Sequence, residues 1–169
     1  MHRIRLINDE WKFLSTQVGV SYEDALSSGG WQRVDIPHDF LIHDTKNLYK
    51  TQTGWYQRQL AIDKKEGERY LLRFEGVYQD STIFLNSTPV KEWKYGYSTF
   101  EADITDAAVD GDNLLVVRAV HQSPNSRWYS GAGIYRNVYF KTVDSVRFAS
   151  DGIYVTPVQE ETAWKVIID

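Results

Sequence analysis

The chain has 169 residues, a length typical of one domain, and a domain of this size can bury enough surface to fold without covalent cross-links. It contains no cysteine, which excludes disulfides and thiolate metal sites. The formal net charge is −4 and no long basic run occurs, so nucleic-acid binding is disfavoured, since phosphate contacts need clustered Lys and Arg. No stretch approaches the roughly 20 apolar residues of a membrane span, and the first residues lack the hydrophobic segment of a secretory signal. We therefore expect a cytoplasmic protein that binds neither nucleic acid nor membrane.

Apolar and polar residues alternate in short segments that are bounded by turn residues, and there is little helical periodicity. The sequence of Ser21–Ser28 is equally compatible with a two-turn helix and with a loop. Turns are expected at Asn86–Pro89 and Asp110–Asn113. The pattern predicts strands at Trp31–Ile36, Trp55–Ile62, Arg69–Phe74, Ser81–Leu85, Val90–Trp93, Phe100–Ile104, Leu114–Val120, Ile134–Lys141, Val143–Phe148, Gly152–Thr156 and Trp164–Ile168. Many short strands separated by turns are typical of a sandwich or a barrel.

Two long irregular stretches interrupt this pattern, Pro37–Thr53 and His121–Gly133. Connections of that length in a compact domain are usually functional or disordered. Both contain aromatic, charged and histidine residues rather than low-complexity sequence, so we expect them to be ordered. Trp11, Trp31 and Trp55 lie on strand patterns and are expected in the core.

Three groups of motifs occur in order along the chain. They are Trp31–Phe40 (WQRVDIPHDF) with Thr53–Arg58 (TGWYQR); Glu75–Asn86 (EGVYQDSTIFLN) with Tyr95–Phe100 (YGYSTF) and Asp103–Thr105 (DIT); and Asn125–Val138 (NSRWYSGAGIYRNV). Over residues 3–142 the ordered set resembles the sugar-binding domain that begins family 2 glycoside hydrolases, which include β-galactosidases, β-glucuronidases and β-mannosidases. The third group is most similar to bacterial β-galactosidases. The chain departs from the family at Asn86-Ser87, where Asn-Gly is usual, and at Trp93–Tyr95, where a His is often seen.

This resemblance implies an all-β fold, a jelly-roll β-sandwich of the galactose-binding type, followed by the first strands of an immunoglobulin-like domain. We expect the sandwich to span residues 1–144, and residues 145–169 to be a linker and the truncated start of that second domain. In the family, the catalytic glutamates lie on a (β/α)₈ barrel, which takes about 250 residues and does not fit in this chain. The resemblance thus implies a non-catalytic domain of a β-galactosidase that supports the missing barrel and immunoglobulin-like domain.

Retaining glycoside cleavage needs two carboxylates about 5 Å apart, and no such pair is evident in the sequence. Asp110 and Asp112 are turn formers, and Glu160 and Glu161 occupy a polar hairpin. We therefore expect the chain to be inactive by itself. We also expect it to bind no cofactor.

Four residues are candidates for contact with the terminal sugar of a β-glycoside: Asp39, Asn125, Arg127 and Trp128. Asp39 is either an Asx turn or an acceptor for a sugar hydroxyl. Arg127 offers a rigid fork of donors that suits vicinal hydroxyls, or it pairs with a carboxylate and holds its loop. The loop position of Arg127 is one that family members use to reach the non-reducing sugar, with Asn125 as a possible companion. Trp128 stacks on a sugar face or anchors the loop.

A metal site at His38 and His43 with Asp39 and Asp44 is not expected, because two histidines on a surface loop without supporting groups are a weak signal. Two other functions remain open. The chain could be an autonomous carbohydrate-binding module, or a structural domain that assembles oligomers through an exposed apolar face. A β-glucuronidase or β-mannosidase parent is also compatible with the motifs.

Overall fold

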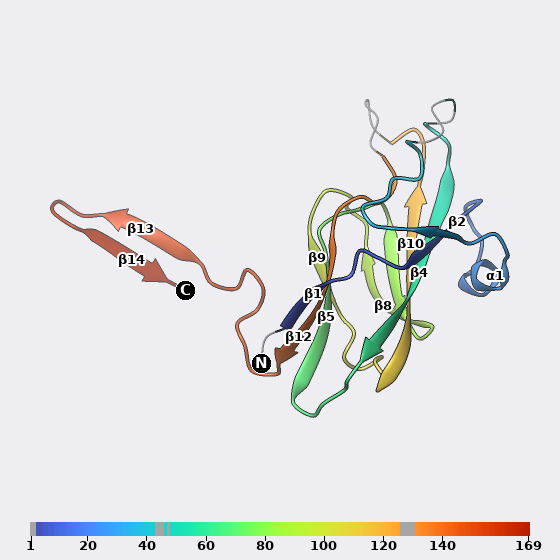
Figure 1. Cartoon of the computed structure of the whole chain (residues 1–169). Helices are drawn as coiled ribbons and strands as arrows, with labels where there is room; N and C mark the ends of the chain where they lie inside the picture. The colour runs from blue at the N-terminus through green and yellow to red at the C-terminus, as the bar shows by residue number, and fades with distance from the viewer. Residues whose placement is uncertain (1–2, 43–45, 47, 126–130) are drawn as a thin grey trace.

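The computed structural model describes residues 3–42, 46, 48–125 and 131–169, and its architecture is a β-sandwich with a separate C-terminal hairpin (Figure 1). The strands are β1 (Arg3–Leu6), β2 (Trp11–Thr16), β3 (Gln32–Val34), β4 (Gln52–Ile62), β5 (Glu68–Phe74), β6 (Val77–Tyr78), β7 (Ser81–Leu85), β8 (Thr88–Trp93), β9 (Phe100–Asp103), β10 (Gly111–His121), β11 (Gly133–Ile134), β12 (Val138–Asp144), β13 (Val155–Gln159) and β14 (Trp164–Ile168).

Two antiparallel sheets form the sandwich. One has the strand order β1-β12-β5-β9 and the other the order β3-β2-β4-β10-β7-β8. Neighbouring strands are often far apart in sequence; β4, for example, pairs with β10 along its whole length, from Gln52 opposite His121 to Ile62 opposite Gly111. The jelly-roll sandwich expected from the sequence is therefore confirmed.

The core lies between the two sheets and is built from the alternating inward positions of their strands. It includes the fully buried side chains of Trp11, Tyr56, Phe74 and Leu115. A second, smaller cluster lies on the outer face of the six-stranded sheet, where Trp55 and Val116 pack against Ala25. Burying these large side chains at roughly 25 cal/mol per Å² is the main stabilising term of the fold.

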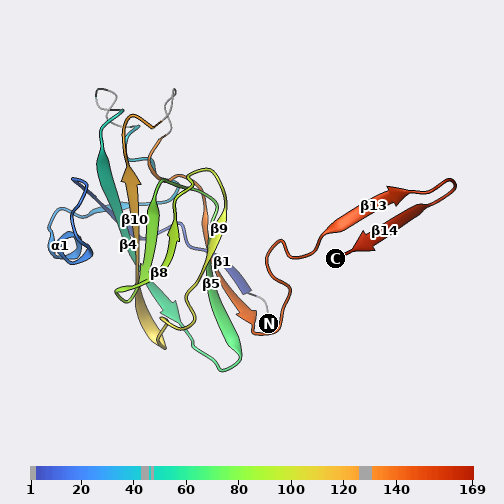
Figure 2. The same cartoon turned by 180° about the vertical axis from the view of Figure 1, so that it is seen from behind.

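Ala25 belongs to the helix α1 (Tyr22–Ser27), which covers part of that outer face (Figure 2). The helix begins because Ser21 is an N-cap: its Oγ accepts a hydrogen bond from Asp24 N at 3.1 Å. It ends at Ser28, whose backbone N–H returns to the carbonyls of Asp24 and Ala25. Of the two readings of this segment, the structure confirms the helix. Among the described residues, no helix is long and apolar enough to cross a membrane.

Several predicted strands have different bounds in the structure. The strand predicted at 134–141 is divided into β11 and β12, because the side chains of residues 135 and 137 bond to other loops: Tyr135 Oη donates to Gly96 O, and Asn137 Oδ1 accepts from Asn8. The strand predicted at 143–148 is wrong beyond Asp144, where the chain bends, and the one predicted at 152–156 begins later, at Val155.

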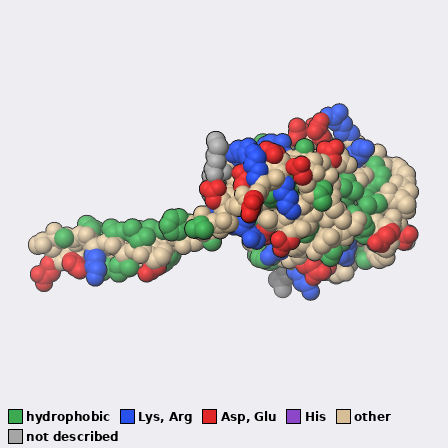
Figure 3. Space-filling model, turned by 90° about the horizontal axis from the view of Figure 1, so that it is seen from below, with side chains coloured by type: hydrophobic (Ala, Val, Ile, Leu, Met, Phe, Trp, Pro, Cys, Tyr) green, Lys and Arg blue, Asp and Glu red, His purple; other side chains and the backbone are tan. Residues whose placement is uncertain are grey.

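The hairpin of β13 and β14 forms a sheet of its own and extends away from the sandwich (Figures 1 and 3). Residues directly opposite in an antiparallel pair share a face. Val155 with Ile168, and Pro157 with Val166, therefore put apolar side chains on the same face as Trp164. Trp164 is 65% exposed and Ile168 69% exposed, so this face has no cover among the described residues.

Candidate functional site

The two long connections meet at one end of the sandwich. The backbone N–H of His38 donates to Ile134 O at 2.8 Å, and that of Phe40 donates to Ala132 O at 2.9 Å. Further along, the Thr51 Oγ1 accepts from Ser123 N at 3.0 Å. These bonds tie the described parts of both connections to each other, so groups on one are held against groups on the other.

Asp39 joins the two connections through one carboxylate oxygen. Its Oδ1 accepts from Leu41 N at 2.9 Å, which closes the Asx turn that the sequence allowed, and from Ala132 N at 3.2 Å. The neighbouring Gly131 has φ +74°, and a Cβ there would lie 2.7 Å from Asp39 Oδ2. A glycine is thus required at this position both for backbone conformation and for the close approach of the carboxylate.

His38 and Tyr56 join the connection that carries Asp39 to the core. His38 Nδ1 lies 2.9 Å from the hydroxyl of Tyr56, and both rings pack on Phe13 in the core. Burial, with a smaller contribution from the charge of Asp39, raises the pKa of the Tyr56 hydroxyl well above its ordinary value. The hydroxyl therefore stays protonated and acts as a hydrogen-bond group that orients His38. A Cβ on Gly133 would lie 2.3 Å from this hydroxyl, so only glycine fits at position 133 beside Tyr56.

A shallow hollow of about 260 Å³ opens beside Asp39, with Pro37, His38, Ile42 and Tyr135 among its sides. Tyr135 is positioned by its hydroxyl, which donates to Gly96 O at 2.7 Å, and by the guanidinium of Arg136, 5.3 Å from its ring centroid. Burial raises the pKa of the Tyr135 hydroxyl, so it stays protonated and keeps its hydrogen bond to Gly96 O.

Tyr135 was not among the residues predicted from the sequence. Its place in the alternating segment 134–141 indicated a strand position, and only the bend between β11 and β12 brings it to the hollow. Tyr95 and Tyr97 were likewise noted only as part of a motif. They form an edge-to-face pair at 5.7 Å, are 62% and 43% exposed, and flank the Gly96 carbonyl that holds Tyr135.

Of the four predicted sugar contacts, the structure describes two. Asp39 lines the hollow. Asn125 lies on the other connection, directly after Pro124. Arg127 and Trp128 lie outside the described residues. Of the predicted core tryptophans, Trp11 and Trp55 are buried, but Trp31 is only partly buried, because it lies at the border of the outer cluster.

The described sides of the hollow supply polar and aromatic groups. Its described sides include one carboxylate, that of Asp39, whereas retaining cleavage of a glycoside needs two. Within the described residues, no group of three or more His, Cys, Asp or Glu could hold a metal ion. A larger hollow of about 460 Å³ lies elsewhere, at the β1 edge, where the guanidinium of Arg5 sits 5.4 Å from the ring centroid of Phe140.

The fold is a jelly-roll sandwich, and a polar and aromatic hollow lies where its two long connections meet. Residues 5–144 match the family model described as the sugar-binding domain of family 2 glycosyl hydrolases. The chain therefore belongs to this family.

Known relatives and structures agree with that assignment. The chain is 33% identical to the β-galactosidase BoGH2A of Bacteroides ovatus, over 88% of this chain and 19% of that protein. It is 32% identical to a β-glucuronidase of Bacteroides fragilis, over 92% and 23%. Among solved structures, a family 2 member from Bacteroides cellulosilyticus superposes with a TM-score of 0.80 at 29% identity, covering 92% of this chain and 22% of the other. The chain thus spans about a fifth of the length of the curated relatives it matches.

Proposed function

We propose that this chain is the non-catalytic N-terminal domain of a longer family 2 glycosidase, of the β-galactosidase type, and that the hollow at Asp39 contributes to recognition of the terminal sugar of a β-glycoside. The observation that carries the proposal is the position of Asp39. Its carboxylate bridges backbone N–H groups of both end connections at 2.9 and 3.2 Å and lines the hollow. A carboxylate fixed in this way is a preorganised acceptor for hydroxyl groups.

The sugar that the parent enzyme cleaves is proposed from the relatives and the sequence motifs. The relatives named above are a β-galactosidase and a β-glucuronidase, and the sequence motifs favour the galactosidase. A β-glucuronidase or a β-mannosidase parent is the alternative, and a β-glucuronidase differs from the other two in the negative charge of the sugar that the hollow would meet.

We further propose that the sandwich spans residues 1–144 and that residues 145–169 are a linker and the start of an immunoglobulin-like domain. The support is that β13 and β14 pair only with each other and carry an apolar face. A lone two-stranded hairpin is marginally stable in water, so such a face calls for further chain packed against it.

The first experiment uses the chain as it is. It is assayed with chromogenic β-galactoside and β-glucuronide substrates, while its amide NMR signals are followed during titration with galactose, lactose and glucuronic acid. We expect no turnover and no saturable shifts at Asp39 or Asn125. Turnover that survives repurification would contradict the non-catalytic role, and saturable shifts at these residues would instead identify an autonomous binding module.

The second experiment tests Asp39 in the longer enzyme that the proposal requires. Asp39→Asn keeps an oxygen for Leu41 N and Ala132 N but removes the charge, so kcat/KM is expected to fall by roughly tenfold or more with little change in melting temperature. Asp110→Asn is the matched control, because Asp110 Oδ1 also accepts from a backbone N–H, that of Lys64, in the turn before β10. Equal kinetics of the three proteins would leave Asp39 with a purely structural role.

A further inference from the structure

The chain that follows β12 turns back over the outer face of the four-stranded sheet. Directly after β12, the backbone N–H of Ser145 donates to Gly67 O at 2.9 Å. The chain then returns toward β12, because Ser150 Oγ lies 2.7 Å from the Nζ of Lys141, which is part of that strand. We call residues 145–151 the strap.

Three charged side chains of the sheet receive the strap. Arg73 on β5 and Glu101 on β9 are directly opposite each other, and Lys141 lies on β12, on the other side of β5. All three project from the outer face, because successive side chains of a strand point to opposite faces and each of the three has a direct neighbour in the core. These core neighbours are Leu72, Phe74, Phe100, Ala102 and Phe140.

The strap and the sheet meet in a closed set of polar contacts. Lys141 Nζ donates to Glu101 Oε1 at 2.6 Å and to Ser150 Oγ at 2.7 Å, and Ser150 Oγ donates to the same Glu101 oxygen at 2.9 Å. Arg73 Nη1 adds longer ionic contacts, 3.8 Å from both Glu101 Oε1 and Asp151 Oδ2. Ser150 therefore uses its hydroxyl both as a donor and as an acceptor. We call these contacts the clamp.

The burial of the charged groups supports the clamp. Lysine and glutamate are almost never fully buried unless they are paired. The side chain of Lys141 is nevertheless only 10% exposed, and that of Glu101 is 22% exposed, although both lie on an outer face. Charges that are partly removed from water are screened less than those of an exposed surface pair. The strap is thus held by contacts that salt and water weaken little.

A tight turn brings the two strap residues of the clamp to the sheet. Gly152 N donates to Ala149 O at 3.0 Å, so Ser150 and Asp151 are the central residues of the turn. Asp151 has φ +56°, the left-handed conformation that the second central residue of a type II turn needs and that Asp tolerates. A Cβ on Gly152 would lie 2.9 Å from Ala149 O, so glycine is required after the turn.

The clamp leaves a very short connection to the C-terminal hairpin. The pairing of the hairpin begins at Tyr154, whose N–H and carbonyl both bond to Asp169 at 3.0 Å. Only Gly152 and Ile153 lie between the clamp and this pair. Without the clamp, the connection would extend over residues 145–153. A short connection restricts the relative motion of the two parts that it joins, whereas a longer one behaves as a flexible linker.

We propose that the clamp is a positioning device, which fixes the strap on the four-stranded sheet and limits the hinge between the sandwich and the hairpin to Gly152 and Ile153. In a longer protein, the chain that continues from the hairpin is then held within a narrow range of positions relative to the sandwich. The device is independent of the sugar that the parent cleaves, because it shares no residue with the hollow at Asp39.

The first test measures the mobility of the strap by heteronuclear NMR relaxation of the isotope-labelled chain. In the wild type we expect the strap amides to be as rigid as those of β12. In the double variant Ser150→Ala/Asp151→Asn they should become as mobile as a free linker on the nanosecond timescale, because both side-chain contacts of the strap are lost. Lys141 and Glu101 still bond to each other in this variant, and Asn tolerates a left-handed φ as Asp does.

Trypsin gives a second measure, because Arg147 lies in the middle of the strap. Cleavage after Arg147 requires the strap to leave the sheet, so its rate follows the population of the released strap. The double variant should be cut there roughly three- to tenfold faster, as expected for the loss of hydrogen bonds and an ion pair. Cleavage after Arg33, an exposed position on β3, is the internal reference and should keep its rate unless the sandwich itself unfolds.

Ser145→Ala is the matched control in the strap, since the bond from Ser145 to Gly67 O comes from the backbone and is kept by alanine. It should behave like the wild type in both measurements. If the double variant does not fold, Ser150→Ala alone is measured in its place. A wild-type strap as mobile as a free linker, or clamp variants that equal the wild type or the Ser145→Ala control, would overturn the proposal. Either result leaves the proposed function standing, because that function is tested at Asp39.

Discussion

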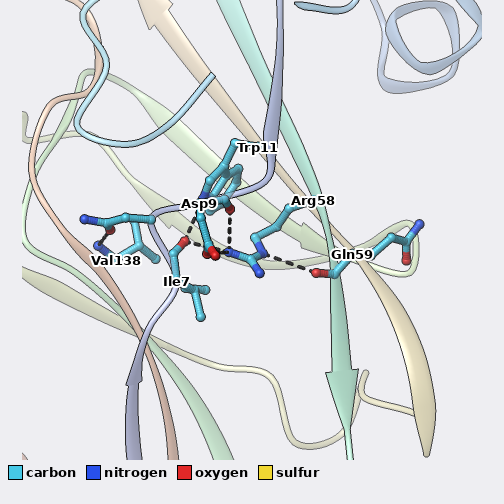
Figure 4. A network of polar contacts seen from close by, with 7 residues as sticks. Ile7, Asp9, Trp11, Arg58, Gln59 and Val138 are labelled. Carbon is cyan, nitrogen blue, oxygen red and sulfur yellow. Dashed lines mark hydrogen bonds and ion pairs between the residues drawn. The ribbon is translucent and has the colours of Figure 1, made fainter. Parts of the chain in front are cut away.

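Arg58 and Trp11 donate hydrogen bonds to the same acceptor, the carbonyl oxygen of Ile7, at 2.8 and 2.7 Å (Figure 4). The guanidinium of Arg58 also lies 5.8 Å from the ring centroid of Trp11 and donates to Asp9 O at 2.8 Å. Residues 7–10 connect β1 in one sheet to β2 in the other. Arg58 therefore fastens the chain where it crosses between the two layers.

Replacement of Arg58 by Met should destabilise the domain strongly. Its side chain is 7% exposed, and burial lowers the pKa of the guanidinium, although the hydrogen bond and charge of Asp9 oppose this. Met keeps the apolar contact with Trp11 but leaves Asp9 O without its donor, so the free energy of unfolding should fall by about 2–4 kcal/mol in urea denaturation. Arg69→Met is the control: its ion pair with Asp103 is exposed, and its loss should cost less than about 1 kcal/mol. Equal effects would show that the crossing is not held by Arg58.

The sequence predicted β4 from its aromatic, alternating residues and β10 from a run of apolar residues bounded by turns, and both strands are largely buried in the structure. It did not predict β1, whose four residues are all exposed and which has only an edge position beside β12. The loss of strand structure between Ile134 and Val138 was also hidden, because the bonds made by Tyr135 and Asn137 reach residues far away in the sequence.

The same limit applies to the candidate site. The composition of the two long connections indicated a functional region, and Asp39 could be singled out from the motif at Trp31–Phe40. Its partner Ala132 is 93 positions away, and no local pattern predicts that contact. Tyr135 was hidden for the opposite reason, since an aromatic residue in an alternating segment is ordinary for a strand.

Substitution of Ser87 by Gly should stabilise the protein. Asn86 and Ser87 form the turn between β7 and β8 with φ +49° and +70°, the left-handed conformations of a type I′ hairpin. Ser87 is exposed, so glycine loses no buried contact, and it removes the steric cost of a Cβ at positive φ. We expect a gain of about 0.5–1 kcal/mol, or roughly 1–4 °C in melting temperature by calorimetry. Ser87→Ala keeps the Cβ and should give no such gain; stabilisation by both would refute the conformational explanation.

Glu101 should make the stability of the sandwich depend on pH. Burial by itself would raise the pKa of this carboxyl, but hydrogen bonds from Lys141 Nζ at 2.6 Å and Ser150 Oγ at 2.9 Å outweigh burial and lower it. Arg73 Nη1, 3.8 Å away, acts in the same direction. A carboxyl whose folded-state pKa is depressed adds stability that is present above its unfolded pKa and is lost as the pH falls through the folded pKa.

Glu101→Gln should therefore lower the melting temperature at neutral pH, and its difference from the wild type should shrink in acid as the wild-type carboxyl is protonated. Urea denaturation at a series of pH values measures this convergence. Glu92→Gln, at an exposed position on β8, is the control, and its stability should depend on pH in the same way as that of the wild type. A constant difference between Glu101→Gln and the wild type at all pH values would contradict the assigned cause.

The apolar face of the C-terminal hairpin should govern the association of the isolated chain (Figure 3). Trp164 and Val166 are 65% and 57% exposed on the same face of β14. Apolar surface of this kind binds hydrophobic dyes and promotes self-association. The double variant Trp164→Ser/Val166→Thr should lower the fluorescence of bound anilinonaphthalene sulfonate and shift sedimentation velocity profiles toward the monomer. The melting temperature of the sandwich should stay the same, because the hairpin pairs only with itself among the described residues. Lys165→Thr, on the opposite face, should change neither measurement, and if it acted like the double variant, the effect would belong to the hairpin as a whole rather than to its apolar face.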